Sequence, residues 1–209
     1  MFNRIIGIVG PTGSGKSYTA AKIMAEQDRA AVYQLVPNDA AYLACADDIF
    51  DGNLKAMALS MIQPRFRFIY RVPPESAVTR GNRFYFPDFS TFVKMCFTRQ
   101  DMMMLIDEAH FLCNPRFMPL EFWQSVVTGR HQYLDIVFIT QRFSMVHHDM
   151  TANASKFYFW NTHETADLEG IAKRCGQETA DKVKTLRKTV DNRASGGSII
   201  PGEVLEWVP

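Results

Sequence analysis

The segment Gly10–Ser17 reads GPTGSGKS and matches the phosphate-loop pattern G-x-x-x-x-G-K-[ST] at every fixed position. Its glycines permit backbone conformations that a Cβ would penalise, so successive N–H groups can point at a phosphate. The side chain of Lys16 would reach the β- and γ-phosphates of a nucleoside triphosphate, and the hydroxyl of Ser17 would bind Mg²⁺. The predicted nucleotide-binding residues are Gly10, Pro11, Thr12, Gly13, Ser14, Gly15, Lys16, Ser17 and Tyr18.

The elements on both sides of this loop are those that the chemistry needs. Residues 4–9 form an apolar, β-branched run that predicts a buried strand, and residues 17–25 predict the start of a helix. A helix N-terminus carries partial positive charge and free N–H groups, which favours a bound anion. The agreement of strand, loop and helix favours a phosphate site over a glycine-rich turn that binds nothing.

A pair of carboxylates, Asp107 and Glu108, follows the apolar run at residues 102–106. We expect that run to be a buried strand that delivers Asp107 to Mg²⁺ and Glu108 to the attacking water as a general base. A water-activating base favours ATP hydrolysis over small-molecule kinase chemistry. The other interpretation is a strand that ends in solvated carboxylates. His110 fits a local structural or coupling role at least as well as a catalytic one.

Polar residues near a second apolar run, residues 135–140, complete the candidate site. Gln141 is placed like a sensor, a side-chain amide that contacts the γ-phosphate or the attacking water; the alternative is a polar cap on a buried strand. Arg130 is a candidate arginine finger for the site of a neighbouring subunit, and Arg116 and Arg142 compete for that role. Arg130 could instead be a cation that stabilises the C-terminus of a helix.

The composition indicates a single globular domain. The chain has 209 residues, of which 47% are hydrophobic and 22% charged, so it can bury one full core. A formal net charge of +1 argues neither for nor against nucleic acid binding. No signal peptide and no apolar run of about 18 residues is visible. We expect an ATPase core at residues 1–190 and an extension or hairpin at 191–209.

Apolar runs alternate with stretches of helical spacing, which predicts an α/β fold with a mainly parallel sheet. The predicted strands are residues 4–9, 30–36, 66–72, 102–106, 135–140 and 155–160. One predicted helix directly follows the phosphate loop. The others span residues 40–58, 86–98, 120–129, 164–175 and 178–188. Ligands of such sheets bind at the carboxyl ends of the strands, where the phosphate loop, the two carboxylates and Gln141 are expected.

Two further groups could bind ligands, and each has a simpler interpretation. His147, His148 and Asp149 could hold a metal, but adjacent residues point differently from most backbones, which favours a solvated loop. Five arginines between residues 65 and 83 could line a DNA channel and contact phosphates; a solvated face is equally consistent with them.

Four motifs together resemble the FtsK/HerA superfamily of DNA-pumping ATPases. They are Gly10–Ser17, Ile106–His110, Gly129–His131 and Ile139–Arg142. The sequence is most similar to the compact genome-packaging ATPases of membrane-containing icosahedral viruses. The resemblance implies a RecA-like P-loop domain, ATP and Mg²⁺ as cofactors, Asp107 at the metal, Glu108 as base, Gln141 as sensor and Arg130 as trans finger.

The same resemblance implies that the protein assembles as a ring, typically a hexamer, with double-stranded DNA in its channel. Capsid or vertex proteins are then expected partners, and the host cytoplasm or the virion the expected location. A filamentous-phage-type assembly ATPase, which usually carries a membrane anchor, and a small-molecule or nucleotide kinase stay open as alternatives.

Overall fold

The computed structural model describes residues 4–36, 40–76, 78–80, 83–191, 199–200 and 202–209. An eight-stranded sheet forms the centre, in the order β12-β9-β1-β8-β7-β2-β4-β3. All its pairings are parallel except that of β12 with β9. The strands are β1 (Ile5–Val9), β2 (Arg29–Gln34), β3 (Asp48–Asp51), β4 (Phe66–Arg71), β7 (Met102–Ile106), β8 (Leu134–Thr140), β9 (Lys156–Phe159) and β12 (Leu205–Trp207).

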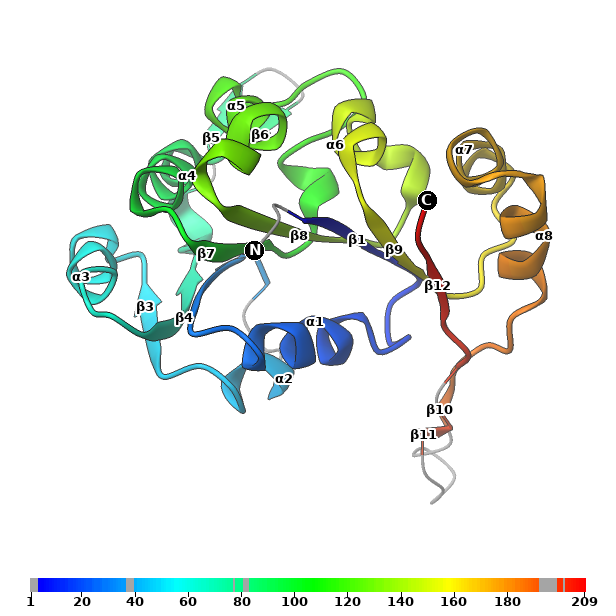
Figure 1. Ribbon diagram of the computed structural model, residues 1–209, viewed down its shortest axis with the longest axis horizontal. Coiled ribbons are helices and arrows are strands. Elements are labelled where there is room, and N and C mark those ends of the chain that lie inside the picture. Colours follow the sequence, from blue (N-terminus) through cyan, green and yellow to red (C-terminus); the bar gives the residue numbers. More distant parts are fainter. Residues whose placement is uncertain (1–3, 37–39, 77, 81–82, 192–198, 201) are drawn as a thin grey trace.

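Helices cover both faces of the sheet, so the predicted α/β class with a mainly parallel sheet is confirmed (Figure 1). On one face lie α1 (Lys16–Ala25) and α2 (Ala40–Leu43). On the other lie α3 (Leu54–Ser60), α4 (Pro87–Arg99), α5 (Leu120–Thr128) and α6 (His148–Asn153). Beyond β9, α7 (Thr165–Cys175) and α8 (Gln177–Thr185) pack together beside β12.

Each face of the sheet has its own hydrophobic core. The larger core lies under α4 and α5 and contains the aromatic rings of Tyr33, Phe89 and Phe122, of which the first two meet edge-on and the last two are tilted. The smaller core lies under α1 and includes Ile8, Val32 and Leu105. Alternate residues of β1, β2 and β7 point to opposite faces, which is why these strands read as continuous apolar runs. The four central strands are therefore buried on both sides.

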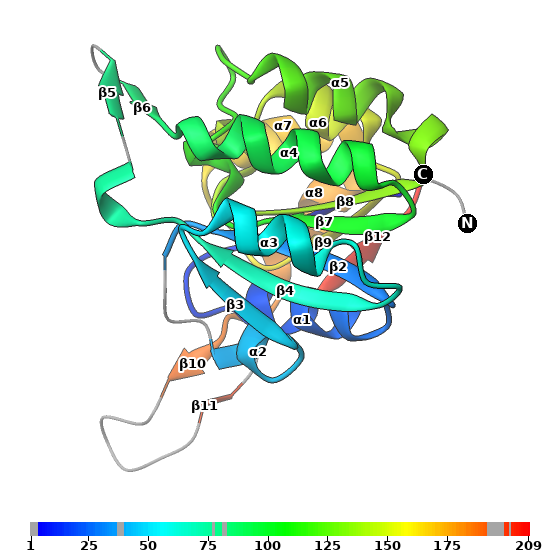
Figure 2. The same ribbon diagram turned by 90° about the vertical axis from the view of Figure 1, so that its left-hand side faces the viewer.

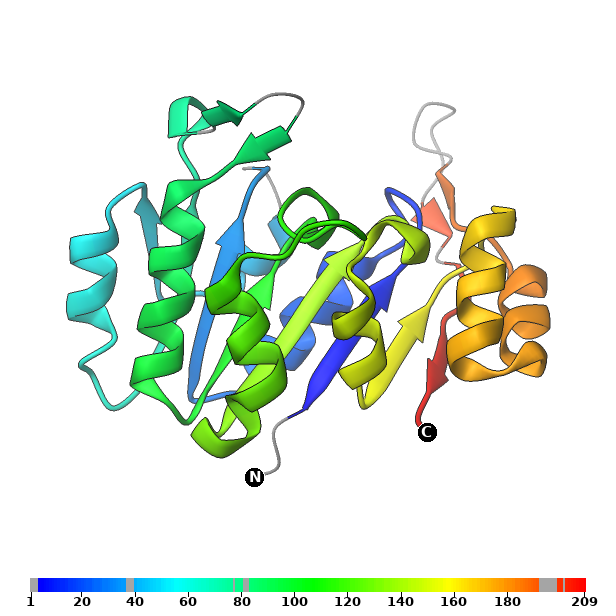
Figure 3. The ribbon, with the colours of Figure 1, turned by 90° about the horizontal axis from the view of Figure 1, so that it is seen from above.

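Two short hairpins extend from this core. The first consists of β5 (Val78–Arg80) and β6 (Arg83–Tyr85), and the second of β10 (Val190–Asp191) and β11 (Ile199–Ile200). Both project from the carboxyl end of the parallel strands (Figures 2 and 3). The predicted domain boundary at residue 190 stays a prediction; the last strand, β12, adds to the edge of the main sheet.

The predicted helix at residues 40–58 is wrong in its middle. The chain there forms the short α2, then the edge strand β3, and only then α3. Gly52 has a φ of 67°, a conformation that favours glycine and breaks a helix. The side chain of Asn53 accepts a hydrogen bond from the N–H of Ala56 and so caps α3. In the described residues, no helix has the length and apolar content of a membrane span.

Candidate nucleotide site

The predicted phosphate loop joins β1 to α1 at the carboxyl edge of the sheet. Gly13 and Gly15 have φ values of 76° and 102°, in the left-handed region where a side chain would be strained. Gly15 is the N-cap residue of α1, so no side chain caps the first amides of the helix. The ammonium of Lys16 lies 2.8 Å from the carbonyl oxygen of Pro11 inside the loop. This geometry is that of an anion cradle at a helix N-terminus.

Gly10 is required for packing rather than for backbone freedom. A Cβ at this position would lie 2.8 Å from the Cβ of Trp160 and 3.0 Å from the Oγ of Ser14. Glycine therefore lets the end of β1 pass close to the residue after β9. The loop that follows is held next to that residue.

A cavity of about 530 Å³ gathers most of the predicted residues around this loop. Its lining contains loop residues together with the two carboxylates and the predicted sensor: Thr12, Gly13, Gly15, Lys16, Ser17, Tyr18, Asp107, Glu108 and Gln141. Carboxylate, hydroxyl and phosphate oxygens are the ligands that Mg²⁺ prefers. The oxygens of Ser17 and Asp107 therefore fit the predicted cation.

The predicted base and sensor are hydrogen-bonded to each other. The Nε2 of Gln141 donates to the Oε1 of Glu108 over 2.9 Å. Glu108 has a φ of 50°, a strained conformation for a residue with a Cβ. Ile106, the last residue of β7, pairs with Phe138 of β8. Glu108 and Gln141 therefore follow adjacent strands at the same edge of the sheet. The site thus has a carboxylate oriented by an amide.

His110 lies behind Glu108 and is buried. Its Nδ1 is 3.4 Å from the Oε2 of Glu108 and 3.4 Å from the Oγ1 of Thr140. Burial lowers the pKa of His110 from its usual 6.5; Glu108 opposes the shift and the charge of Lys16 adds to it. The Oε2 of Glu108 is buried and has no hydrogen-bond partner in the described residues. His110 is therefore a close neighbour of Glu108, and the hydrogen bond that orients the carboxylate is the one from Gln141.

The three candidate arginines differ in position. Arg130 lies in the 3₁₀ turn η3 (Gly129–Gln132) after α5, and its side chain lies outside the described part of the structure. Arg116 is exposed, and its N–H donates to the side chain of Asn114. Arg142 is paired within its own chain, with Nε 2.8 Å from Asp167 and Nη2 3.2 Å from Glu164. These two ion pairs within its own chain argue against Arg142 as a finger that reaches another subunit.

A second cavity, of about 580 Å³, adjoins the first and shares Thr12 and Gln141 with it. It lies between the loop and the chain that follows β9 and α8, and includes Trp160, Asn161, Glu164, Arg187 and Thr189. Thr189 also donates a long hydrogen bond of 3.5 Å to the carbonyl of Ser14. No motif marks these residues in the sequence, and only the fold brings them to the loop.

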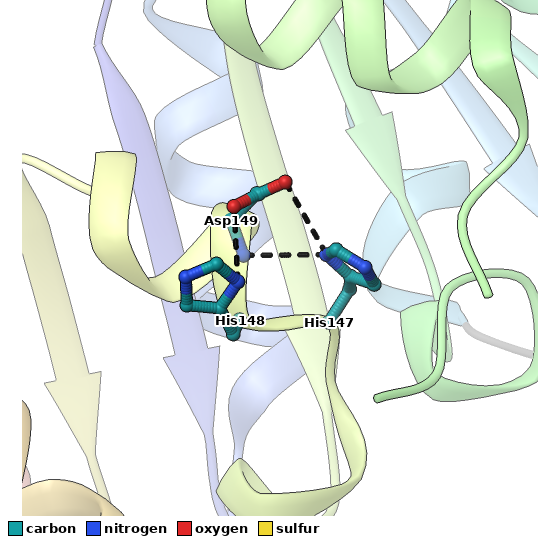
Figure 4. A group of neighbouring side chains, drawn as sticks. All are labelled: His147, His148 and Asp149. Carbon is teal, nitrogen blue, oxygen red and sulfur yellow. Dashed lines mark hydrogen bonds and ion pairs between the residues drawn. The ribbon is translucent and has the colours of Figure 1, made fainter. Parts of the chain in front are cut away.

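His147, His148 and Asp149 lie together at the start of α6 (Figure 4). Asp149 accepts from Trp123 over 3.0 Å and lies 2.9 Å from the Nδ1 of His148. The Nδ1 of His147 accepts from the N–H of Asp149 at 3.3 Å and so caps the helix. All three side chains come from one tripeptide, and the positive end of a helix disfavours a cation. In the structure His147 caps α6, while Asp149 pairs with Trp123 and His148.

The arginines of the predicted basic run with described side chains are paired with acids. Arg65 pairs with Asp28, Arg67 with Asp47 and Arg71 with Asp51. These pairs favour the interpretation of a solvated face for this part of the run. The side chains of Arg80 and Arg83 lie outside the described residues.

Solved structures share this fold over nearly the full chain. The genome packaging NTPase B204 from Sulfolobus turreted icosahedral virus 2, in complex with ATP-gammaS, superposes with a TM-score of 0.70 at 17% identity, over 99% of this chain and 97% of that one. B204 described as the DNA-packaging ATPase from Sulfolobus Turreted Icosahedral Virus gives 0.70 at 17% identity, over 100% and 99%. The expected likeness to viral genome-packaging ATPases is thus confirmed in the fold.

A comparison of the sequence with curated proteins found no match. The family model described as "Zonular occludens toxin (Zot)" matches residues 5–194, which include the phosphate loop, both carboxylates, the sensor position and the helices α1 to α8. The chain therefore belongs to the zonular occludens toxin (Zot) family.

Proposed function

We propose that this protein is an ATP-hydrolysing motor that translocates double-stranded DNA and packages a viral genome into a preformed capsid. The observation that carries the proposal is the hydrogen bond between Gln141 and Glu108 beside the phosphate loop. A carboxylate oriented next to bound phosphates activates water, whereas a kinase excludes water from that position. The fold of the B204 packaging enzymes supports the coupling of that hydrolysis to DNA.

In this proposal the residues of the first cavity divide the work of hydrolysis. The loop amides and Lys16 bind the phosphates, and Ser17 and Asp107 hold Mg²⁺, which neutralises phosphate charge when bound. Glu108 takes the proton of the attacking water, and Gln141 orients that water or contacts the γ-phosphate. Each role follows from the side chain's chemistry and its position at the cavity.

We assign the nucleoside part of ATP to the second cavity. It is contiguous with the phosphate site through Thr12 and Gln141, and its size is in the range of small-ligand sites. Trp160 and Asn161 form part of its wall. A nucleotide that occupies both cavities would lie along the carboxyl edge of β9, β1 and β8.

The proposed motor acts as a ring, with a hexamer as the expected form and DNA backbone contacts that do not read sequence. Arg130 is the proposed finger that reaches the γ-phosphate of the neighbouring subunit. Capsid or vertex proteins are the proposed partners, and the host cytoplasm or the virion the proposed location.

The test is the rate of ATP hydrolysis with and without duplex DNA, measured together with the native mass. A multimer whose rate rises several-fold with DNA of any sequence supports the motor. A Lys16→Ala variant purified in the same way is the control for contaminating ATPases, because it removes the phosphate-binding cation. A monomer indifferent to DNA would contradict the motor, and phosphate transferred to a small acceptor would identify a kinase.

A further inference from the structure

Asp167 lies next to the candidate site, where it contacts Arg142. Among the described residues it is the most deeply buried charged residue. Only 1% of the residue is exposed, and it lies in the first turn of α7. A buried carboxylate is stable only where several donors surround it. Its Oδ1 accepts from the backbone N–H and the hydroxyl of Ser144, at 2.9 and 2.6 Å, and its Oδ2 accepts from the Nε of Arg142 at 2.8 Å.

The donors to Asp167 come from the turn that directly follows the sensor. Arg142 is the residue after Gln141, and Ser144 lies in the 3₁₀ turn η4 (Phe143–Met145). On the other side of Gln141, the hydroxyl of Thr140 donates to the carbonyl of Arg142 at 3.1 Å and accepts from its N–H at 3.3 Å. Gln141 is therefore held between two fixed residues.

We infer that Arg142 and Asp167 are positioning residues that anchor the sensor loop to α7 and thereby aim Gln141 at Glu108. The inference rests on the proposed hydrolysis. It assigns Arg142 a role within its own subunit. In the Thr-Gln-Arg motif, Thr140 and Arg142 then fix the backbone on either side of Gln141, and Gln141 orients Glu108. The second carboxylate partner of Arg142, Glu164, is exposed, lines the second cavity and pairs with the Nη2 of the guanidinium.

The anchor predicts a specific defect in Asp167→Asn. The asparagine has the same shape, but its NH₂ group replaces one of the two carboxylate oxygens. That group donates hydrogen bonds, so it cannot accept one from Ser144 or Arg142. We expect kcat for ATP hydrolysis to fall roughly 10- to 100-fold, the range for misplaced catalytic groups. The dissociation constant of a non-hydrolysable ATP analogue should change less than about 3-fold. Asp181→Asn is the matched control, because Asp181 is an exposed carboxylate of α8 that accepts a hydrogen bond from Gln177 on the same helix.

A double-mutant cycle separates positioning from general stability. If Asp167 acts through Gln141, the Asp167→Asn change should reduce kcat in the wild type but have almost no further effect in a Gln141→Leu background. Both variants are assayed well below their melting temperatures. Additive losses of kcat would overturn the anchor while leaving the proposed ATPase intact. A wild-type protein without ATPase activity would instead refute the proposed function itself.

Mixed assemblies test the assignment of Arg142 to its own subunit. Arg142→Ala protein is mixed with Glu108→Gln protein, so that some interfaces combine an intact Glu108 with an intact Arg142 from the neighbour. A cis anchor predicts that the mixture stays as inactive as its components. Activity regained on mixing would show that Arg142 acts in trans and would overturn the inference.

Discussion

Gln141 donates a 2.9 Å hydrogen bond to Glu108, although 33 residues separate them in the sequence. The bond joins the ends of β8 and β7, which are adjacent in the sheet. This hydrogen bond fixes the orientation of the predicted base within the protein itself. A ligand at the γ-phosphate position would compete for the same amide, so that nucleotide binding and base orientation become linked.

The Glu108→Gln variant should bind ATP and fail to hydrolyse it. The amide keeps the size of the side chain but removes the base that takes the proton from water. We expect a fall in kcat of at least about 100-fold with nucleotide affinity unchanged within a few-fold, measured by phosphate release and by calorimetry. Normal turnover by this variant would remove Glu108 as the base. Binding lost together with turnover would indicate a folding or phosphate-site defect.

Replacement of Gln34 by Met should stabilise the protein. Gln34 is buried at the end of β2, and neither atom of its amide has a hydrogen-bond partner in the described residues. Removal of an unsatisfied buried amide by an apolar chain of similar volume should raise the free energy of unfolding by about 1–2 kcal/mol. Denaturant unfolding measures this change, and a less stable variant would show that the amide has a partner.

The same variant reports on the cation site. The register of β2 with β7 places Gln34 beside Asp107, because Tyr33 and Ile106 are paired just before them. A change in the Mg²⁺ dependence of nucleotide-analogue binding would show that the amide supports Asp107. Gln63→Met, a change at a position outside both cores and both cavities, is the control for a general effect of the substitution.

The stability of the protein should fall with acidification partly because of His110. Burial lowers its pKa in the folded state below the usual 6.5, so the unfolded chain binds a proton first as the pH falls. The contribution is complete above about pH 6.5 and is lost as the pH decreases toward the folded pKa. Urea unfolding of the wild type and His110→Gln between pH 5 and 8 should show a smaller pH dependence in the variant. Equal slopes would contradict this assignment.

The ion pair of Arg4 with Asp135 should matter more than an exposed pair. Three hydrogen bonds of 2.7–3.0 Å join Arg4 to this nearly buried carboxylate at the start of β1 and β8. Arg4→Ala removes two of them, and we expect a loss of about 1–2 kcal/mol of unfolding free energy. Arg65→Ala breaks the exposed pair with Asp28 and should change stability by less than about 0.5 kcal/mol. Similar effects of both variants would show that burial of the carboxylate is unimportant.

Features with a local signal could be predicted from the sequence. The phosphate loop depends on glycines and a lysine at fixed spacing, and the buried strands depend on continuous apolar runs. Both patterns can be recognised within a short segment of the sequence. The helix expected across residues 40–58 failed because the edge strand β3 forms by pairing with β4, a contact that its own composition does not announce. The roles assigned to the individual site residues stay predictions.

The sequence by itself determined which residues could bind a triphosphate, hold a cation and activate water. Only the tertiary structure decided which of them meet, because strand order in a sheet depends on packing between distant segments and not on local propensity. The insertion of β8 between β1 and β7 brings Gln141 to Glu108, and the packing of α7 beside that edge brings Asp167 to Arg142. A buried aspartate in the first turn of a helix looks like any other helix start in the sequence; its burial and its partners exist only in the fold.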